Sequence, residues 1–499
     1  MQQALLASVF VVASCGLAYE LIAGALASYV LGDSVTQFST VIGTYLFAMG
    51  VGSWLSKYVV RDLVGRFVRI EIIIGVLGGF SAALLYFMFV WAPEPFKLAL
   101  YLIVFLIGML VGLEIPLIMR ILKRDVAFKD LVSQVLTFDY LGALAVSILF
   151  PVLLVPHLGL VRSALLFGLL NVAVALWALW LFRAQLPAIA WLRGQGIAAF
   201  VLLAAAFAGA GELTSIAERH LYADEVVHAE SSPYQRIVVT RWKDDLRLHL
   251  NNNLQFSSRD EYRYHEALVH PGLATLPGAK RVLVLGGGDG LAVREILKYP
   301  QVESVTLVDL DPAMTRLFST APALTALNEG ALSSSKVKVV NADALVWLEE
   351  SRERFDFVVI DFPDPSNFAI GKLYSAAFYR LLDKHLSETG LAVVQSTSPL
   401  YARQSFWCVV TTIESTGLLA TPYHALVPSF GEWGYVLVGR RAYVPPPAYP
   451  VETRFLSPAM APALFEFPKD MARVPAEVNQ LNNQVLVRYF EREWRHVIR

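Results

Sequence analysis

The chain has few cysteines and little net charge for its length. Only two of its 499 residues are cysteines, Cys15 and Cys408, and both lie in apolar surroundings. We therefore predict no disulfide framework and no metal site. A net charge of -1 gives no general attraction to nucleic acid, so no nucleic-acid partner is expected. Charged residues make up 17% of the chain and hydrophobic ones 56%, with a mean hydropathy of +0.52, which is too apolar for an ordinary soluble protein.

The apolar excess is concentrated in the first half of the chain. Seven stretches there approach the ~20 residues that a bilayer requires: 4–31, 38–56, 70–92, 98–119, 135–156, 161–182 and 195–211. The first is too long and too lightly flanked by positive charge to be a cleaved signal peptide. Residues 1–211 are therefore expected to form a multi-pass α-helical bundle in the cell membrane, with six or seven spans and seven favoured.

Basic loops bear on the orientation of this bundle. Two loops between expected spans carry clusters of Lys and Arg: Lys57, Arg61, Arg66 and Arg69 in one, Arg120, Lys123, Arg124 and Lys129 in the other. The positive-inside rule places both loops and the N-terminus in the cytoplasm. Seven spans would then carry the C-terminal half outside. Either the seventh segment lies in the interface, or the charge rule misleads, or the C-terminal half is external.

The second half is organised around the stretch Arg281-Val-Leu-Val-Leu-Gly-Gly-Gly-Asp-Gly290. It predicts a buried strand at 281–285, a glycine turn, and a helix that begins near Leu291. Glycines at a strand–helix turn let a ligand approach the backbone. The dinucleotide fingerprint Gly-x-Gly-x-x-Gly fails because its last position is Leu291. Asp289 would repel a pyrophosphate, so the turn favours a cationic ligand that lacks phosphate.

More acids lie at or just after the ends of successive predicted strands at 304–310, 336–341 and 355–360. They are Asp309, Asp343, Asp361 and Asp364. In open α/β sheets ligands bind beyond the carboxyl ends of the strands, so these acids and Asp289 should converge. Each acid alone could be a helix N-cap, and Asp311 before Pro312 is read as one. The repetition over four strands favours a site for a cation.

Shorter elements surround this predicted Rossmann-like α/β domain, which we assign to residues 271–467. Residues 212–270 are expected to form a small β-domain and a linking helix, with strands at 225–228, 236–240 and 246–250 and the helix at 260–269. The last clear strand is predicted at 434–439. An amphipathic helix is predicted at 474–494, within a C-terminal segment of residues 468–499.

Several motifs together give a resemblance. They are Glu230-Ser-Ser-Pro-Tyr-Gln235, Arg259-Asp-Glu-Tyr-Arg-Tyr-His-Glu266, Gly286-Gly-Gly-Asp-Gly290, Val308-Asp-Leu-Asp311, Asn341-Ala-Asp-Ala344, Asp361-Phe-Pro-Asp-Pro365 and Gly431-Glu-Trp-Gly-Tyr435. In this order and spacing, residues 222–467 resemble the polyamine aminopropyltransferase (spermidine synthase) family, in a form with an N-terminal membrane domain. The resemblance implies a methyltransferase-type Rossmann-like fold.

The resemblance implies a cosubstrate, decarboxylated S-adenosylmethionine, and no prosthetic group. Its binding residues would be Gln235, Gly286, Gly288, Asp289, Asp309, Asp343 and Ala344. Asp289 would hold the amino end of the aminopropyl group, Asp309 the ribose hydroxyls, and Asp343 with the Ala344 backbone the adenine. Because such cosubstrates are cytoplasmic metabolites, the resemblance favours a cytoplasmic catalytic domain. A homodimer is left open.

The same resemblance implies an amine acceptor such as putrescine, giving spermidine and methylthioadenosine. The acceptor site would comprise Tyr264, His265, Asp361, Asp364 and Gln395, with Asp361 as the base that removes the amine proton. His265 alone would more simply be a buried core histidine. The segment 366–372, with Asn367 and Gly371, is a candidate lid.

Two departures from the family concern the acceptor. The loop after Asp361 reads Phe-Pro-Asp-Pro-Ser-Asn, where Ser or Thr and then Gly-Pro are usual, and Phe430 replaces a common tyrosine. A longer polyamine or a lipid-borne amine is therefore an alternative acceptor. Two other functions stay open: an S-adenosylmethionine-dependent amine methyltransferase, which Asp289 disfavours, and a polyamine-binding transporter or sensor.

Acids also occur within the expected spans, at Glu20, Glu114 and Asp139. Ionisable groups at membrane depth are costly and mark functional sites. Glu114 has a simpler reading, since it can lie at the interface beside Arg120. We expect Glu20 and Asp139 to face each other across the bundle and to hold an amine or a proton.

Overall fold

The computed structural model describes residues 2–31, 34–92, 94–122, 128–183 and 189–494. The chain divides into two compact units, Met1–Val226 and Val227–Arg499. Lys123 and Arg124, which enter the charge argument on orientation, lie outside the described residues.

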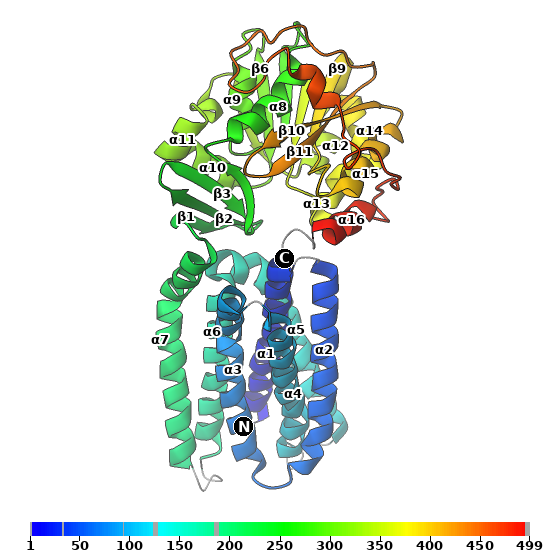
Figure 1. The fold of residues 1–499 in the computed structure, drawn as a ribbon. Coiled ribbons are helices and arrows are strands. Elements are labelled where there is room, and N and C mark those ends of the chain that lie inside the picture. Colours follow the sequence, from blue (N-terminus) through cyan, green and yellow to red (C-terminus); the bar gives the residue numbers. More distant parts are fainter. Residues whose placement is uncertain (1, 32–33, 93, 123–127, 184–188, 495–499) are drawn as a thin grey trace. The chain divides into compact units, whose positions relative to one another are not determined.

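The first unit is built from long helices (Figure 1). They are α1 (Gln2–Leu31), α2 (Ser34–Leu55), α3 (Leu63–Trp91), α4 (Phe96–Leu122), α5 (Phe128–Leu149), α6 (Val155–Leu181) and α7 (Ile189–Leu221). A π-helical stretch, Phe150–Leu154, joins α5 to α6, and Gly159 near the start of α6 has a non-helical backbone (φ 71°, ψ 177°) that kinks the chain there. By length and composition, six helical segments of the described chain are long and apolar enough to cross a membrane, and α5 and α6 together count as one of them. The expected boundary after residue 211 falls inside α7.

Glycines allow the closest helix contacts in this unit. A Cβ on Gly75 of α3 would lie 2.8 Å from the carbonyl oxygen of Gly168 on α6, and one on Gly168 would lie 2.5 Å from that of Gly75. A Cβ on Gly112 of α4 would collide with the backbone of Met49 on α2. Small residues at such crossings let the helix backbones approach each other closely.

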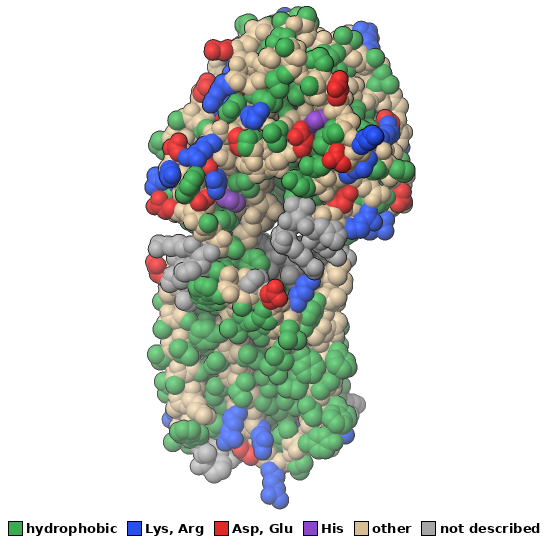
Figure 2. All heavy atoms as spheres, viewed as in Figure 1, with side chains coloured by type: hydrophobic (Ala, Val, Ile, Leu, Met, Phe, Trp, Pro, Cys, Tyr) green, Lys and Arg blue, Asp and Glu red, His purple; other side chains and the backbone are tan. Residues whose placement is uncertain are grey.

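The outward surface of the helical unit is apolar. Large hydrophobic side chains are exposed on most of its helices, including Phe47, Leu98, Tyr140, Val152 and Trp191 at 68, 74, 68, 69 and 68%. On the face shown in Figure 2, hydrophobic side chains cover the unit between its ends, and the charged ones lie near the ends. Exposed apolar surface of this extent is typical of a protein–protein or membrane interaction site.

The second unit begins with a small antiparallel sheet. Its strands β1 (Glu225–Ser231), β2 (Arg236–Trp242), β3 (Asp245–Leu250) and β4 (Asn253–Ser257) pair in sequence order. The fourth strand was not predicted. Helix α8 (Glu261–Leu273) follows and packs against the large sheet through buried residues such as Leu268 and Leu273.

The large sheet has seven strands in the order β10-β11-β9-β8-β5-β6-β7. They are β5 (Arg281–Gly286), β6 (Ser304–Asp309), β7 (Val337–Asn341), β8 (Phe355–Asp361), β9 (Leu386–Gln395), β10 (Leu419–Val427) and β11 (Gly431–Gly439). Strands β5 to β9 pair in parallel, and β10 and β11 add antiparallel at one edge. The Rossmann-like fold expected from the sequence is therefore present.

Helices cover both faces of this sheet, so its strands are buried on each side. One core cluster joins α8 to α9 (Leu291–Leu297) and α10 (Pro312–Thr320). The other joins α12 (Ala344–Glu350), α14 (Ala376–His385), α15 (Arg403–Glu414) and α16 (Val485–Trp494). This double layer leaves the carboxyl ends of β5, β6 and β8 as the edge from which the predicted acids emerge.

The C-terminal helix prediction was wrong in extent, because α16 begins only at Val485 and not near residue 474. The Asn479 side chain donates to the carbonyl oxygens of Gly371 and Tyr374 at 3.0 and 3.1 Å, which holds the preceding segment in an irregular path. Gln484 has a positive φ of 44°, and the Asn483 side chain accepts from the Val485 N–H at 3.2 Å. The helix therefore starts from a capped turn.

Candidate active site

The glycine turn forms the floor of the site. Gly286 ends β5 with φ 80°, and a Cβ there would collide with the backbone carbonyl of Asp361 on the neighbouring strand. A Cβ on Gly288 would lie 2.7 Å from the Asp309 carboxylate, which instead accepts a hydrogen bond from the Gly288 N–H at 3.0 Å. Only glycine fits at both positions, and its absence of a side chain brings two acids against the turn.

Three of the predicted acids gather here. Asp289 lies in the turn, 9% exposed, and accepts from the Leu291 N–H at 2.9 Å. Asp309 ends β6 and Asp361 ends β8, and each interacts electrostatically with Asp289. Burial, with the nearby Asp311 and Asp289, raises the pKa of Asp309 to about 6. Burial also raises the pKa of Asp289. This crowding of carboxyl groups is costly unless cations join them.

Among the described residues, Asp361 accepts a side-chain hydrogen bond from Tyr264. The Tyr264 hydroxyl, on α8, donates to Asp361 Oδ1 at 2.6 Å. Burial raises the pKa of Asp361 to about 6, and Asp289 adds to this, whereas His265 and the Tyr264 hydrogen bond oppose it. A carboxyl group with a pKa near neutrality can accept a proton from a substrate and release it again, as a general base must.

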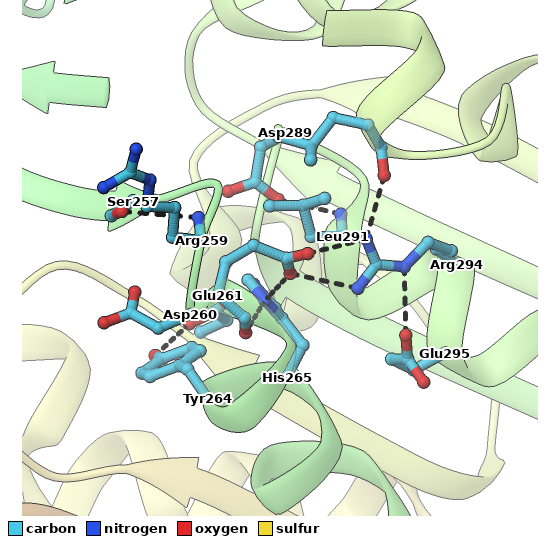
Figure 3. A network of polar contacts seen from close by, with 12 residues as sticks. Ser257, Arg259, Asp260, Glu261, Tyr264, His265, Asp289, Leu291, Arg294 and Glu295 are labelled. Atoms are coloured by element: carbon cyan, nitrogen blue, oxygen red, sulfur yellow. Dashed lines mark hydrogen bonds and ion pairs between the residues drawn. The ribbon is translucent and has the colours of Figure 1, made fainter. Parts of the chain in front are cut away.

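His265 is held by a chain of buried ion pairs (Figure 3). Its Nδ1 contacts Glu261 Oε2 at 2.8 Å. Arg294 binds both oxygens of Glu261, through Nη1 at 2.9 Å and Nη2 at 3.0 Å, and its Nε donates to Glu295 at 2.9 Å. Burial lowers the pKa of His265, but the hydrogen bond to Glu261 and the charges of Glu261, Asp289 and Asp361 together outweigh burial and raise it. The ring therefore favours its cationic form beside Asp289 and Asp361.

Asp364 follows β8 and is short of donors. Its Oδ1 is buried without a hydrogen-bond partner among the described residues, and its Oδ2 is 3.4 Å from the Thr397 hydroxyl. Burial raises its pKa to about 7. Thr397 itself has a positive φ of 58°, an uncommon conformation for a β-branched residue. Strain of this kind is often found at functional sites, and here it places a hydroxyl beside an unsatisfied carboxyl group.

Gln395, predicted to contact substrate, is occupied by the protein. Its amide nitrogen donates to the Phe362 carbonyl and, at 2.8 Å, to the Tyr374 hydroxyl. Its amide oxygen accepts from Trp433 Nε1 and from the Thr397 N–H, both at 3.2 Å. With both donors and the carbonyl in use, Gln395 holds together the two loops that carry Asp364 and Thr397.

Aromatic rings lie around Tyr264. Its ring centroid is 6.3 Å from Phe430 and 5.6 Å from Tyr435, and Phe430 lies 5.1 Å from Trp433. Asp260 accepts from the Ser429 N–H and hydroxyl at 2.6 and 2.9 Å, which fixes the loop that presents Phe430. The site thus combines carboxyl groups with apolar ring surface.

The predicted nucleoside residues lie at two further places. Gln235 donates to Asp311 at 3.0 Å, and Asp311 also accepts from the Ser232 hydroxyl at 2.7 Å. Asp311 caps α10 as predicted, through the Ala313 N–H, but it also anchors the Gln235 loop, a role that sequence reasoning missed. Because the Asp311 N–H donates to Asp309 at 2.8 Å, the Gln235 loop is connected to the acid group.

Asp343 stands apart from the other acids. It caps α12 by accepting from the Leu345 N–H at 2.9 Å, and Lys372 donates to its second oxygen at 2.7 Å. Burial would raise the pKa of Asp343, but the hydrogen bond and charge of Lys372, with the backbone N–H groups of Leu345 and Val346, together outweigh burial and lower it. Ala344 begins α12 directly after it. Lys372 was not singled out from the sequence.

The candidate lid has regular structure. It contains α13 (Phe368–Gly371), which Asn367 caps through the Ile370 N–H at 3.0 Å, and a 3₁₀ turn, Lys372–Tyr374. A Cβ on Gly371 would lie 2.5 Å from both Gln484 and Val487, so the C-terminal segment packs against its end. A lid role stays a prediction. No group of three or more metal-ligating side chains occurs among the described residues.

Comparisons with known proteins give one family. Residues 261–444 match the model of the spermine/spermidine synthase domain. The chain is 61% identical to polyamine aminopropyltransferase 2 of Ralstonia nicotianae, over 99% of both chains. It is 55% identical to the polyamine aminopropyltransferase of Leptospira interrogans over the whole of both chains. A crystal structure of a spermidine synthase with the transition-state analogue AdoDATO is 23% identical, covers 50% of this chain and 88% of that chain, and gives a TM-score of 0.46.

Proposed function

The chain belongs to the polyamine aminopropyltransferase family, and on this premise we propose that its C-terminal unit transfers the aminopropyl group of decarboxylated S-adenosylmethionine to an amine such as putrescine. The products are spermidine and methylthioadenosine. The observation that carries the proposal is the gathering of Asp289, Asp309 and Asp361 around the glycine turn, with the partly unsatisfied Asp364 beyond them. The two substrates are cationic, and side by side they supply the positive charge that balances these carboxylates.

The cosubstrate occupies the glycine turn and its flanks. Asp289 binds the amino end of the aminopropyl group, and Gly286 and Gly288 let the chain lie against the backbone. Asp309 accepts from the ribose hydroxyls in addition to the Gly288 N–H. Gln235, tethered to Asp311, closes this side. Asp343 and the Ala344 backbone contact the adenine, with Lys372 holding the Asp343 carboxylate in place.

The amine acceptor lies between Asp361 and Asp364. Its nitrogen attacks the methylene carbon bonded to the sulfonium, the carbon–sulfur bond breaks, and the electron pair of that bond stays on sulfur. Asp361 takes the proton that the amine must lose, and Tyr264 fixes the orientation of its carboxyl group. Asp364 binds the distal ammonium, and Gln395 keeps its loop in position. The rings of Tyr264 and Phe430 contact the methylene chain.

His265 acts through charge. Its cationic ring interacts electrostatically with both Asp289 and Asp361. Glu261 and Arg294 hold that ring through the buried ion-pair chain, so His265 keeps part of the acid group ionised while no substrate is bound.

The proposal is tested by incubating the purified protein with decarboxylated S-adenosylmethionine and a panel of diamines, longer polyamines and lipid-borne amines. Mass spectrometry of the products identifies the acceptor. The proposal requires methylthioadenosine with every productive amine. It fails if S-adenosylmethionine is turned over in place of its decarboxylated form, since that is the outcome expected of an amine methyltransferase.

We further propose that the helical unit spans the cell membrane. The apolar length of its helices and their exposed hydrophobic side chains support this. Counting α5 and α6 as separate crossings gives seven spans, which place the two ends of the unit on opposite sides. Substrates made in the cytoplasm favour a cytoplasmic catalytic unit. With seven spans, the N-terminus then lies outside the cell. This arrangement also places the loop that contains Lys57 and Arg61 outside, which goes against the positive-inside rule. Protease protection of tags at the N-terminus and the C-terminus, measured in sealed vesicles, tests this membrane topology. A homodimer stays a prediction.

A further inference from the structure

The loop between the two acids of the acceptor site has few contacts of its own to hold it. Asp361 ends β8, and Asp364 follows in the loop after it. Pro363 and Pro365 have no backbone N–H, so the position of this loop depends on the groups that bind its carbonyl oxygens. The Asp364 side chain adds little, because its Oδ1 has no described partner and its Oδ2 is 3.4 Å from the Thr397 hydroxyl.

A tyrosine hydroxyl binds this loop midway between the acids. Tyr374 lies fully buried in the 3₁₀ turn of the candidate lid, and its hydroxyl is 3.2 Å from the carbonyl oxygens of both Phe362 and Pro363. Gln395 donates to the oxygen of this hydroxyl at 2.8 Å, which leaves the hydroxyl proton for the two carbonyls. Burial and the nearby Asp364 raise the pKa of Tyr374, so the hydroxyl keeps its proton.

The turn that carries Tyr374 is itself fixed by the C-terminal segment. Asn479 is fully buried there, and its amide nitrogen donates to the carbonyl oxygens of Gly371 and Tyr374 at 3.0 and 3.1 Å. The backbone carbonyl of Asn479 accepts from the Ala376 N–H at 2.9 Å. The Tyr374 hydroxyl is therefore a fixed point, and because it is buried it acts on the loop and not directly on a substrate.

The spacing of the two acids has a chemical consequence for the amine. Asp361 takes a proton from the attacking nitrogen and Asp364 binds the distal ammonium, so the separation of their carboxyl groups must match the chain between the two nitrogens. One methylene more or fewer displaces a nitrogen by about 1 Å, and a misplacement of that size can cost about 10²-fold in rate. A group that fixes the spacing of the acids therefore also selects the length of the amine.

We propose that Tyr374 is a positioning residue that sets the spacing of Asp361 and Asp364, and through that spacing the length of amine that the protein accepts. Its hydroxyl holds both carbonyl oxygens of the intervening chain from a turn that Asn479 fixes. This proposal rests on the proposed aminopropyl transfer and adds to it a residue that determines acceptor specificity without touching the acceptor.

The test measures kcat/KM of the full chain for three acceptors: the amine that gives the most product, and its homologues with one methylene fewer and one more. Tyr374→Phe removes only the hydroxyl. The preference for the best amine over its homologues should then fall about fivefold or more, the effect of losing one hydrogen bond. The KM for decarboxylated S-adenosylmethionine should stay the same, because Asp289 and Asp309 are held by backbone N–H groups of the glycine turn and of the start of α9.

Tyr379→Phe is the matched control. Tyr379 lies on α14 and is as fully buried as Tyr374, but its hydroxyl has no hydrogen-bond partner among the described residues, so the amine preference should not change. A second variant, Asn479→Ser, keeps the Tyr374 hydroxyl and shortens the side chain that fixes its turn. The preference should fall in the same direction. Methylthioadenosine binding, measured by calorimetry, reports whether each variant keeps a folded site.

Three results would overturn the assignment of Tyr374. They are an unchanged amine preference in Tyr374→Phe, an equal loss of kcat/KM for all three amines, and the same change of preference in Tyr379→Phe. If Tyr374→Phe no longer binds methylthioadenosine, Asn479→Ser decides, and an unchanged preference in that variant overturns the proposal. Absence of aminopropyl transfer by the unmodified chain would refute the proposed function itself, and this proposal with it, so the two failures are told apart.

Discussion

Replacing Asp361 with asparagine removes the proposed base while keeping the shape of the site. The amide that Asp361→Asn introduces still offers an oxygen to the Tyr264 hydroxyl, which lies 2.6 Å from Asp361 Oδ1 in the unmodified chain. It cannot take a proton from the amine. General-base assistance contributes about 10²–10⁴-fold, so turnover should fall by about 10²-fold or more, equivalent to about 2.7 kcal/mol of barrier. Cosubstrate affinity should change only a few-fold, because Asp289 and Asp309 remain.

The pH profile identifies the group. Asp361 must be ionised to act, and its pKa is raised from an unperturbed value of about 3.9 to about 6. The value of kcat/KM for the amine should therefore rise with pH through about 6, with a further rise near 7 where Asp364 ionises. In the Asp361→Asn variant the limb near 6 should disappear and the limb near 7 should remain.

The assay is steady-state turnover of the purified protein at several pH values, with cosubstrate binding measured separately by calorimetry. Asp356→Asn is a matched control, because Asp356 lies on the same strand and its carboxylate accepts backbone N–H groups of Lys280 and Arg281, at the far end of β8. Near-normal turnover in Asp361→Asn, or loss of cosubstrate binding in step with turnover, would refute the assignment of the base.

Four further predictions concern the same unit. Arg294→Lys keeps the positive charge but loses the two-pronged contact with Glu261. Because Glu261 then holds His265 less firmly, kcat should fall and the limb of the pH–rate profile near pH 6 should shift to higher pH. An unchanged profile would make the ion-pair chain purely structural. Asp309→Asn should weaken cosubstrate binding more than it lowers kcat, which substrate titration separates. Asp364→Asn should lower turnover yet raise the unfolding temperature at pH 8. The folded-state pKa of Asp364 is about 7, above the unfolded value of about 3.9, so the native chain loses stability as the pH rises between these two values. The gain in unfolding temperature should therefore vanish below about pH 4, and a gain at all pH values would contradict this origin. A fragment of residues 222–499 should fold alone, since it contains both sheets, and insoluble material from several nearby start points would argue for a shared core.

The acids of the site could be predicted because each lies at, or just beyond, the carboxyl end of a strand that is apolar on both faces. The runs 281–285, 304–310 and 355–360 identify buried parallel strands, and Asp289, Asp309 and Asp361 follow from their ends. The sequence could not show that Gln395 has its amide fully occupied, because its partners Tyr374 and Trp433 come from distant segments.

Other features depend on tertiary contacts that leave only a weak local signal. Glu261 and His265 are four residues apart on one helix, a spacing that does suggest a pair, but Arg294 joins them from another helix. Strand β10 was missed since Pro422 interrupts its pattern, and proline is tolerated there because β10 is the edge strand of the sheet. Glu71 falls at the start of the expected span 70–92, where a charged residue is ordinary, although the structure buries it inside the bundle.

Aminopropyl transfer is tested most directly by following the transferred carbon atoms. The purified protein is given decarboxylated S-adenosylmethionine labelled with ¹³C in its aminopropyl group, together with unlabelled putrescine. We expect spermidine carrying all of the label and an equal amount of unlabelled methylthioadenosine. Label that remains on the nucleoside product, together with methylated putrescine, would contradict the transfer.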